Sequence, residues 1–234
     1  MTQSYRLHYA PDNASLIIRL ALEELGVPYD TALVDRAARA QRAPAYLRLN
    51  PMGLIPVLET PDGPIFETGA ILLWLADRHG GLIPDPLAPG RGAALKWLFF
   101  VSNTLHPALR MTFYPDAHTD GDADEQARLR AHAQGRIKGC LDKLDVAAGD
   151  HPDLFNGDRP GVIALYLGPL LRWMALYPED HTAWFDLHDW PRLRALALGL
   201  ERRASAAAAI RAEGLGQQPF SDPQPADPPE GSAT

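Results

Sequence analysis

Residues 50–77 constrain the fold of this chain more than any other stretch. Pro56 directly precedes a short run that favours a strand, and a proline has no N–H for a sheet ladder, so it belongs at the start or the edge of that strand. The strand predicted at 57–60 turns at Pro61-Asp62-Gly63, which is a strong turn signal. A second short strand, Ile65-Phe66, follows and leads into a helix.

That helix begins at Glu67-Thr68, and its apolar residues recur at helical spacing, at Ile71, Leu72, Trp74 and Leu75. A helix N-terminus exposes unpaired N–H groups and partial positive charge, so it favours a carboxylate ligand. Glu67 can receive an ammonium group and Thr68 can donate to a carboxylate, so the pair can hold an amino-acid head group. The alternative is that both residues merely cap the helix.

Just before the strand, the backbone N–H and C=O of Ile55 are free to pair with an extended peptide. The whole pattern of strand, turn, strand and helix with Glu-Thr at its start resembles the glutathione S-transferase family. The resemblance implies that Leu54, Ile55, Pro56, Glu67 and Thr68 bind the cysteinyl and γ-glutamyl parts of glutathione.

Composition excludes several classes of protein. The chain of 234 residues is 46% hydrophobic, and no apolar run approaches the 18 residues that suggest a membrane span, so we expect a globular protein without a membrane partner. A formal charge of −7 without a basic stripe argues against nucleic acid. No signal peptide precedes the first strand, and we expect a cytoplasmic protein.

The single cysteine, Cys140, excludes a disulfide framework, a paired redox motif and a thiolate metal site. It lies in an apolar-patterned helix, so we expect a buried, inert thiol. The eight histidines are scattered without ligand spacing, and we predict no metal.

The order of elements predicts two domains. Strands at 6–10 and 29–34 and helices at 14–25 and 37–49 precede the stretch above, which gives a β-α-β-α-β-β-α order over residues 1–80. Gly26 is the expected C-cap of the first helix. A linker rich in glycine and proline spans 81–90, and residues 91–215 are helical in pattern, with helices near 93–111, 122–148, 162–176 and 190–204. The family resemblance implies an α/β thioredoxin-like N-terminal domain followed by an all-α C-terminal domain. Residues 216–234 predict a disordered tail.

A glutathione thiol needs a donor that favours its thiolate. Residues 7–16 resemble the bacterial beta class, in which a cysteine occupies the position of Ala14, so this chain cannot form a mixed disulfide there. Asn13 and Ser15 remain as donors, and each has an alternative role in the turn or helix cap. We favour Asn13, because Ser15 is one step into the helix. Residues 66–76 also resemble the nu class. Members of that class use an Asn or Thr in the loop after the first strand, where Asn13 lies here, and reduce disulfides with glutathione.

Residues 97–107 are similar to the beta-class helix that closes the active site. The resemblance implies that His106 lines the thiol pocket and that Asn103 reaches the glutathione of a partner subunit; a structural histidine is the alternative. The usual lysine is replaced by Pro107, which we expect to bend or break the helix. Arg39 stands where relatives bind the glycine carboxylate, with a solvated surface arginine as the alternative.

The family's capping box before its central helix is also absent, since Gly161 and Ala164 occupy the box. Glycine is a tolerable N-cap, so we expect that helix to form.

Three functions are compatible with this sequence pattern. The first is a glutathione transferase that activates the thiol by hydrogen bonding for attack on an electrophilic small molecule, with glutathione as co-substrate, in detoxification. The second is a glutathione-dependent disulfide or peroxide reductase, and the third is a non-catalytic glutathione-binding interaction module. The resemblance implies a homodimer.

Overall fold

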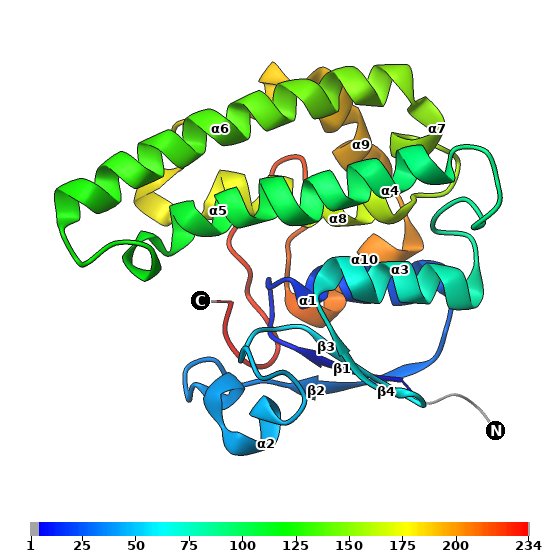
Figure 1. Ribbon diagram of the computed structural model, residues 1–234, viewed down its shortest axis with the longest axis horizontal. Coiled ribbons are helices and arrows are strands. Elements are labelled where there is room, and N and C mark those ends of the chain that lie inside the picture. The colour runs from blue at the N-terminus through cyan, green and yellow to red at the C-terminus, as the bar shows by residue number, and fades with distance from the viewer. Residues whose placement is uncertain (1–4, 234) are drawn as a thin grey trace.

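Four short strands form a mixed sheet in the order β2-β1-β3-β4 (Figure 1). In the computed structural model, which describes residues 5–233, β1 (Tyr5–Tyr9) runs parallel to β2 (Tyr29–Leu33) and antiparallel to β3 (Val57–Thr60). The turn after β3 lets β4 (Gly63–Phe66) pair with it antiparallel, whereas β1 and β2 are parallel because a helix connects them. Leu7 pairs with Leu58 in the middle of the sheet, and both are fully buried.

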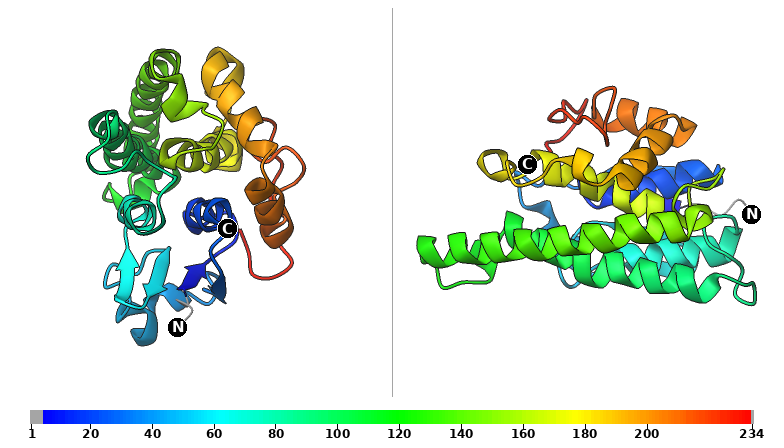
Figure 2. Two further views of the ribbon diagram at one scale, coloured as in Figure 1. Left: turned by 90° about the vertical axis from the view of Figure 1, so that its right-hand side faces the viewer. Right: turned by 90° about the horizontal axis from the view of Figure 1, so that it is seen from above.

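Helices cover both faces of this sheet. On one face lie α1 (Ser15–Leu25) and α3 (Thr68–His79), between the sheet and the helical half of the molecule (Figures 1 and 2). Gly26 ends α1 in the left-handed region, at φ 64°, as predicted. The other face is covered by a 3₁₀ turn (Ala40–Arg42) and α2 (Pro44–Leu47). These replace the longer helix predicted at 37–49, because Pro44 holds the residue before it extended.

The second half of the chain is helical. Its helices are α4 (Arg91–Phe100), α5 (His106–Phe113), α6 (Ala123–Asp150), α7 (Pro152–Phe155), α8 (Val162–Leu176), α9 (Pro191–Glu201) and α10 (Ala204–Glu213). Every residue from 162 to 174 of α8 is buried, which makes it the central helix. The predicted α/β domain followed by an all-α domain is therefore confirmed.

Two of the predicted helices differ from those observed. Between α4 and α5 the backbone widens into a π-helical turn (Val101–Leu105), and Pro107 follows as the second residue of α5. Proline lacks the N–H that a regular helix needs, so the expected disruption takes the form of a wider turn. The helix predicted at 190–204 is α9 alone, because the backbone at Arg203 is extended and α10 begins after it.

The N-cap of α8 is Gly161, as expected, and no side chain caps the helix. The N–H of Val162 donates instead to the carbonyl of Leu82, in the segment that follows α3. A Cβ at Gly161 would lie 2.9 Å from that same carbonyl oxygen. The glycine thus permits a close contact between the start of α8 and the connection between the two halves.

The segment after α10 was predicted to be disordered, and in the structure it packs against the rest of the chain instead. Phe220 is buried in the main core, and Glu201 accepts hydrogen bonds from the N–H groups of Phe220 and Ser221. Arg172 donates to three backbone carbonyls of this segment, at Leu215, Pro219 and Gln224. The segment then passes the end of α10 and continues to the loop after β1 and the segment after β2, where Gly231 lies near Pro11 and Leu33, and Ala233 accepts from Arg36 (Figure 1). Its composition suggested disorder, but one aromatic anchor and a buried guanidinium hold it.

Among residues 5–233, no helix combines the length and the apolar character that a bilayer crossing requires. Cys140 is a buried free thiol on α6, and burial raises the pKa of this thiol.

Candidate active site

A cavity of about 610 Å³ lies between the two halves of the molecule. Its walls come from the β1–α1 loop, the segment before β3, the start of α3, the π-helical turn and α5, and α8 with the residues after it. Seven of the predicted site residues line it: Asn13, Leu54, Ile55, Pro56, Glu67, Thr68 and His106. Ser15, Arg39 and Asn103 are not among the lining residues.

Glu67 and Thr68 lie at the start of α3, where the helix presents its free N–H groups. Glu67 holds a left-handed backbone conformation, with φ 71°, which is uncommon for a residue with a side chain. Its carboxylate makes no cap hydrogen bond and no ion pair within residues 5–233. The capping alternative therefore finds no support in the geometry of Glu67, whose carboxylate is available to a ligand.

The segment before β3 is held by two side chains that the sequence did not indicate. Tyr46 Oη and Asn50 Nδ2 both donate to the carbonyl of Leu54, each at 2.8 Å. The Ile55–Pro56 peptide bond is cis. These contacts fix the backbone of Ile55 at the cavity wall, where an extended peptide could pair with it.

Asn13 and Ser15 differ in how far their polar groups are already used. Asn13 Oδ1 accepts from the N–H of Ala14 at 2.8 Å, and the amide nitrogen has no partner in the described chain. The Ser15 hydroxyl is fully buried, donates to the carbonyl of Ala10 at 3.0 Å and accepts from its N–H. Asn13 thus has free donors beside the cavity, while Ser15 stabilises the turn.

Asp12, which sequence reasoning missed, anchors this loop. Its backbone is left-handed, with φ 49°, and its carboxylate is fully buried. Arg172 donates to both carboxylate oxygens, at 2.8 and 2.9 Å, while Trp173 Nε1 and Tyr177 Oη donate at 2.7 Å each. Because these donors come from α8 and the residues after it, the loop that carries Asn13 is fixed to the helical half.

A second buried carboxylate supports the same loop from behind. Glu213 Oε2 accepts from the N–H of Asp12 at 2.8 Å, and Glu213 Oε1 accepts from Arg19 Nε at 2.7 Å. Burial raises the pKa of Glu213 to about 7, although Arg19 opposes that rise. No local pattern in the sequence pointed to either buried pair.

His106 opens α5 and faces the cavity. Its Nδ1 lies 3.0 Å from the hydroxyl of Tyr166, which leaves Nε2 for a ligand. Burial, and then the positive charge of Arg110, lower the pKa of His106 to about 4, so the ring is neutral at pH 7. Burial raises the pKa of Tyr166, and a hydrogen bond with Thr68 partly offsets that rise. Tyr166 of α8 thus interacts with Thr68 of α3 and with His106 of α5.

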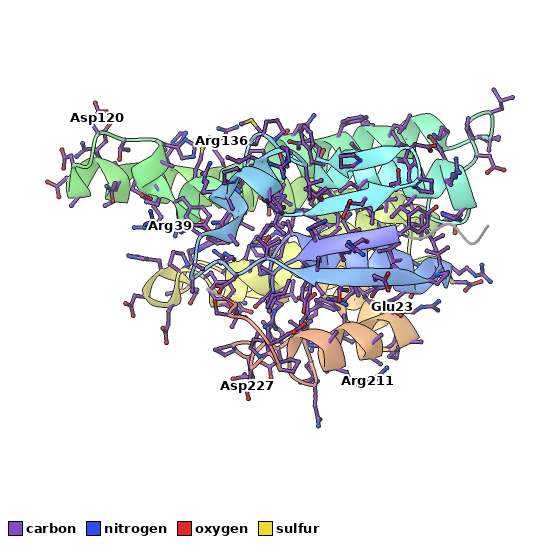
Figure 3. All side chains as sticks on the ribbon, turned by 90° about the horizontal axis from the view of Figure 1, so that it is seen from below. Glu23, Arg39, Asp120, Arg136, Arg211 and Asp227 are labelled. Carbon is purple, nitrogen blue, oxygen red and sulfur yellow. The ribbon has the colours of Figure 1, made fainter. Side chains whose placement is uncertain are left out.

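Two predicted residues lie elsewhere. Arg39 is exposed, with its backbone in the left-handed region at φ 52°, and Figure 3 shows it at the periphery of the molecule. Arg36, three residues earlier, lines the cavity in its place. Asn103 is exposed on the π-helical turn and accepts a hydrogen bond from Ser102. Within residues 5–233, no three His, Cys, Asp or Glu side chains group as metal ligands would.

Comparison with known proteins gives a consistent family. Residues 14–78 match the family described as the glutathione S-transferase N-terminal domain, and residues 125–196 match the corresponding C-terminal domain. Glutathione S-transferase GST-4.5 of Xanthomonas campestris is 30% identical over 212 residues, which cover 90% of this chain and 99% of that protein. A maleylacetoacetate isomerase of Pseudomonas aeruginosa is 31% identical over 196 residues, covering 81% of this chain and 87% of that protein.

Among solved structures, a sphingomonad glutathione S-transferase complexed with glutathione has a TM-score of 0.73 and 30% identity. The likeness covers 90% of this chain and all of that one. Both halves of the fold and nearly the whole length of the relatives are thus matched, and the chain belongs to the glutathione S-transferase family.

Proposed function

We propose that this protein is a glutathione transferase that binds glutathione in the cavity between its two halves. The observation that carries the proposal is the uncommitted carboxylate of Glu67 at the start of α3, in the same cavity as the free amide donors of Asn13. The ammonium of the γ-glutamyl group pairs with the carboxylate of Glu67. The carboxylate of the γ-glutamyl group accepts hydrogen bonds from the backbone N–H groups at the start of α3, at Thr68. The cysteinyl backbone pairs with Ile55, which directs the thiol towards Asn13.

In this proposal, neutral hydrogen-bond donors activate the glutathione thiol. A thiol ionises near pH 8.5 in water, and hydrogen bonds to the thiolate lower that pKa. Asn13 Nδ2 supplies one such bond, and the neutral ring of His106 supplies a second polar contact. The thiol proton leaves to solvent, the thiolate sulfur bonds to the electrophilic carbon, and the bond from that carbon to its leaving group breaks, so that an aryl halide releases halide. No covalent bond to the enzyme forms. Catalysis then rests on the thiol pKa and on positioning.

A disulfide or peroxide reductase is the second candidate. Ala14 stands at the position of the beta-class cysteine, so a disulfide exchange must run between a glutathione thiolate and the substrate without an enzyme thiol. A binding module is the third candidate, and it would leave the thiol pKa of bound glutathione near its solution value.

We further propose that the protein is a cytoplasmic homodimer that detoxifies small electrophiles. Met52, beside α2, and Phe99, on α4, are large apolar side chains left exposed, and a partner that covers them would bury this apolar surface. In this dimer the exposed Asn103, on the π-helical turn after α4, contacts glutathione in the partner subunit. Light scattering at micromolar concentration tests the dimer, and a monomer mass would refute it.

The activity test is a panel of glutathione with an aryl halide, an organic peroxide and a small disulfide. The transferase is supported if the wild type turns over the aryl halide and the Glu67→Gln variant does so with a kcat/KM for glutathione at least about tenfold lower. Turnover of the disulfide or peroxide alone transfers the proposal to the reductase. Glutathione binding in calorimetry without any turnover supports the binding module.

A further inference from the structure

Two guanidinium groups line the cavity away from the groups assigned to the head of glutathione. Arg36 comes from the segment after β2, and Arg110 comes from α5. Within residues 5–233, neither forms an ion pair with a carboxylate. Arg36 donates to the carbonyl of Ala233 at 2.6 Å and to Tyr114 Oη at 3.3 Å. The same tyrosine ring lies 5.6 Å from Arg110 Cζ, so Tyr114 holds both cations at one side of the cavity.

The negative charges of the cavity are already committed. Asp12 is neutralised by Arg172 and two further donors, and under the proposed function Glu67 receives the ammonium of glutathione. His106 is neutral at pH 7, and the charge of Arg110 contributes to that state. The side of the cavity next to α5 is therefore net positive.

The surroundings of Arg110 define the rest of the ligand. The face of α5 that lines the cavity also carries Pro107, Met111 and Phe113, and Trp173 of α8 lines the same cavity. This wall suits an apolar or aromatic body, and the guanidinium suits an anionic substituent on it. Arg110 belongs to the helical half, opposite the segment that holds the backbone of glutathione, so its position favours the second substrate.

We propose that Arg110 selects second substrates that carry a carboxylate or a similar anionic group on an apolar body. The proposal rests on the proposed function, because it names the substrate class of the same site. One other anion competes for these cations, namely the glycine carboxylate of glutathione. Arg36 lies on the same half as Ile55 and is the cation suited to it.

A matched pair of electrophiles tests the selection. The pair is 4-chloro-3-nitrobenzoate and its methyl ester, which react with glutathione in the same way: the thiolate sulfur bonds to the carbon bearing chlorine, the C–Cl bond breaks and chloride leaves. The readout is the ratio of kcat/KM for the acid to kcat/KM for the ester, each divided by its uncatalysed rate. This ratio cancels the difference in intrinsic reactivity.

Three variants are compared with the wild type. Arg110→Gln should lower the acid-to-ester ratio about tenfold to a hundredfold, the range expected for one charge-assisted hydrogen bond, while the rate with the ester changes little. Arg110→Lys keeps the charge and should retain most of the ratio. Arg36→Gln should raise the KM for glutathione with both electrophiles and leave the ratio unchanged. A ratio that is unchanged in Arg110→Gln, or that falls only in Arg36→Gln, overturns the proposal.

Binding of the two conjugates separates this proposal from the proposed function. The conjugates of glutathione with the acid and with the ester are titrated by calorimetry into the wild type and Arg110→Gln. A preference for the acid conjugate that Arg110→Gln loses supports the anion site even if no electrophile is turned over, in which case only the transferase activity fails. Equal preference in both proteins overturns the anion site. Arg110 is exposed, so the variant should fold, and circular dichroism and the thermal midpoint are measured to check its fold.

Discussion

Arg172 and Asp12 form a buried, two-pronged ion pair with Nε–Oδ1 and Nη2–Oδ2 distances of 2.8 and 2.9 Å, and both side chains are completely shielded from solvent. The residues lie 160 positions apart, one in the central helix of the helical half and the other directly before Asn13. The geometry of the loop that carries Asn13 therefore depends on the packing of the two halves against each other.

Removal of one partner of this pair should destabilise the protein strongly. Asp12→Asn or Arg172→Met leaves the other charge buried and uncompensated, which costs about 3–5 kcal/mol of unfolding free energy. Urea denaturation measures this loss. The double variant should lose much less than the sum of the two single losses, and the exposed control Arg39→Gln should lie within about 0.5 kcal/mol of wild type. Additive losses would show that the two side chains act independently.

Glu67 should matter for ligand binding and little for folding. Glu67→Gln keeps the size of the side chain but removes the charge that, in the proposed function, pairs with the ammonium of glutathione, a charge-assisted bond worth about 1.5–3 kcal/mol. Calorimetry should therefore show affinity for glutathione falling at least about tenfold, at an unchanged thermal midpoint. Glu179→Gln, at another exposed glutamate, is the control and should bind as wild type does. Equal affinity in Glu67→Gln and wild type would mean that the ammonium binds elsewhere.

The activating donor can be identified by titrating the thiol of bound glutathione through its ultraviolet thiolate absorption. Asn13→Ala removes a donor that has no other partner in the described chain, and should raise the thiol pKa by about one to two units. Ser15→Ala removes two hydrogen bonds to Ala10, so it should lower stability and leave the thiol pKa unchanged. A raised pKa in Ser15→Ala alone would transfer the role to Ser15. A wild-type pKa near the solution value would favour the binding module over the enzyme.

Glu213 should make stability depend on pH near neutrality. Burial raises its folded-state pKa from 4.5 to about 7, so its contribution is fully present below pH 4.5 and is lost as the pH rises through 7. Relative to Glu213→Gln, the wild type should lose up to about 3 kcal/mol between pH 4.5 and 8. His106, whose pKa is lowered, has the opposite dependence, but it is present in both proteins and cancels. A constant difference between wild type and variant across this range would contradict the raised pKa.

Local signals in the sequence predicted part of the site, and long-range pairs supplied the rest. Pro56, the turn after β3 and the helix that begins at Thr68 are encoded by consecutive residues, so the local structure around Ile55 and Glu67 is predictable, and the family resemblance implies that both belong to one site. The Asp12–Arg172 and Arg19–Glu213 pairs join segments 160 and 194 residues apart and leave no periodicity to detect.

Loop conformation limited the prediction elsewhere. The family resemblance implies Arg39 as the partner of the glycine carboxylate, with a solvated surface arginine as the alternative, and the structure has Arg39 exposed, on a left-handed backbone, while Arg36 lines the cavity. The π-helical turn before Pro107 similarly depends on how α4 and α5 pack, since a proline alone predicts only that a regular helix is disturbed.

The C-terminal segment offers the sharpest contrast between composition and packing. Rich in proline, aspartate and glycine, it predicted disorder, yet Phe220 is 1% exposed and lies against Gly168 of α8, where an added Cβ would be 3.5 Å from its ring. Phe220→Ala should therefore cost about 3–5 kcal/mol of unfolding free energy, the usual range for a buried phenylalanine. A disordered segment would give no change in urea denaturation. Pro229→Ala, at an exposed position of the same segment, is the control and should change stability by less than about 0.5 kcal/mol.

Because Arg172 donates hydrogen bonds both to Asp12 and to the carbonyls of this segment, Phe220→Ala should also raise the thiol pKa of bound glutathione if the segment helps to hold the Asn13 loop.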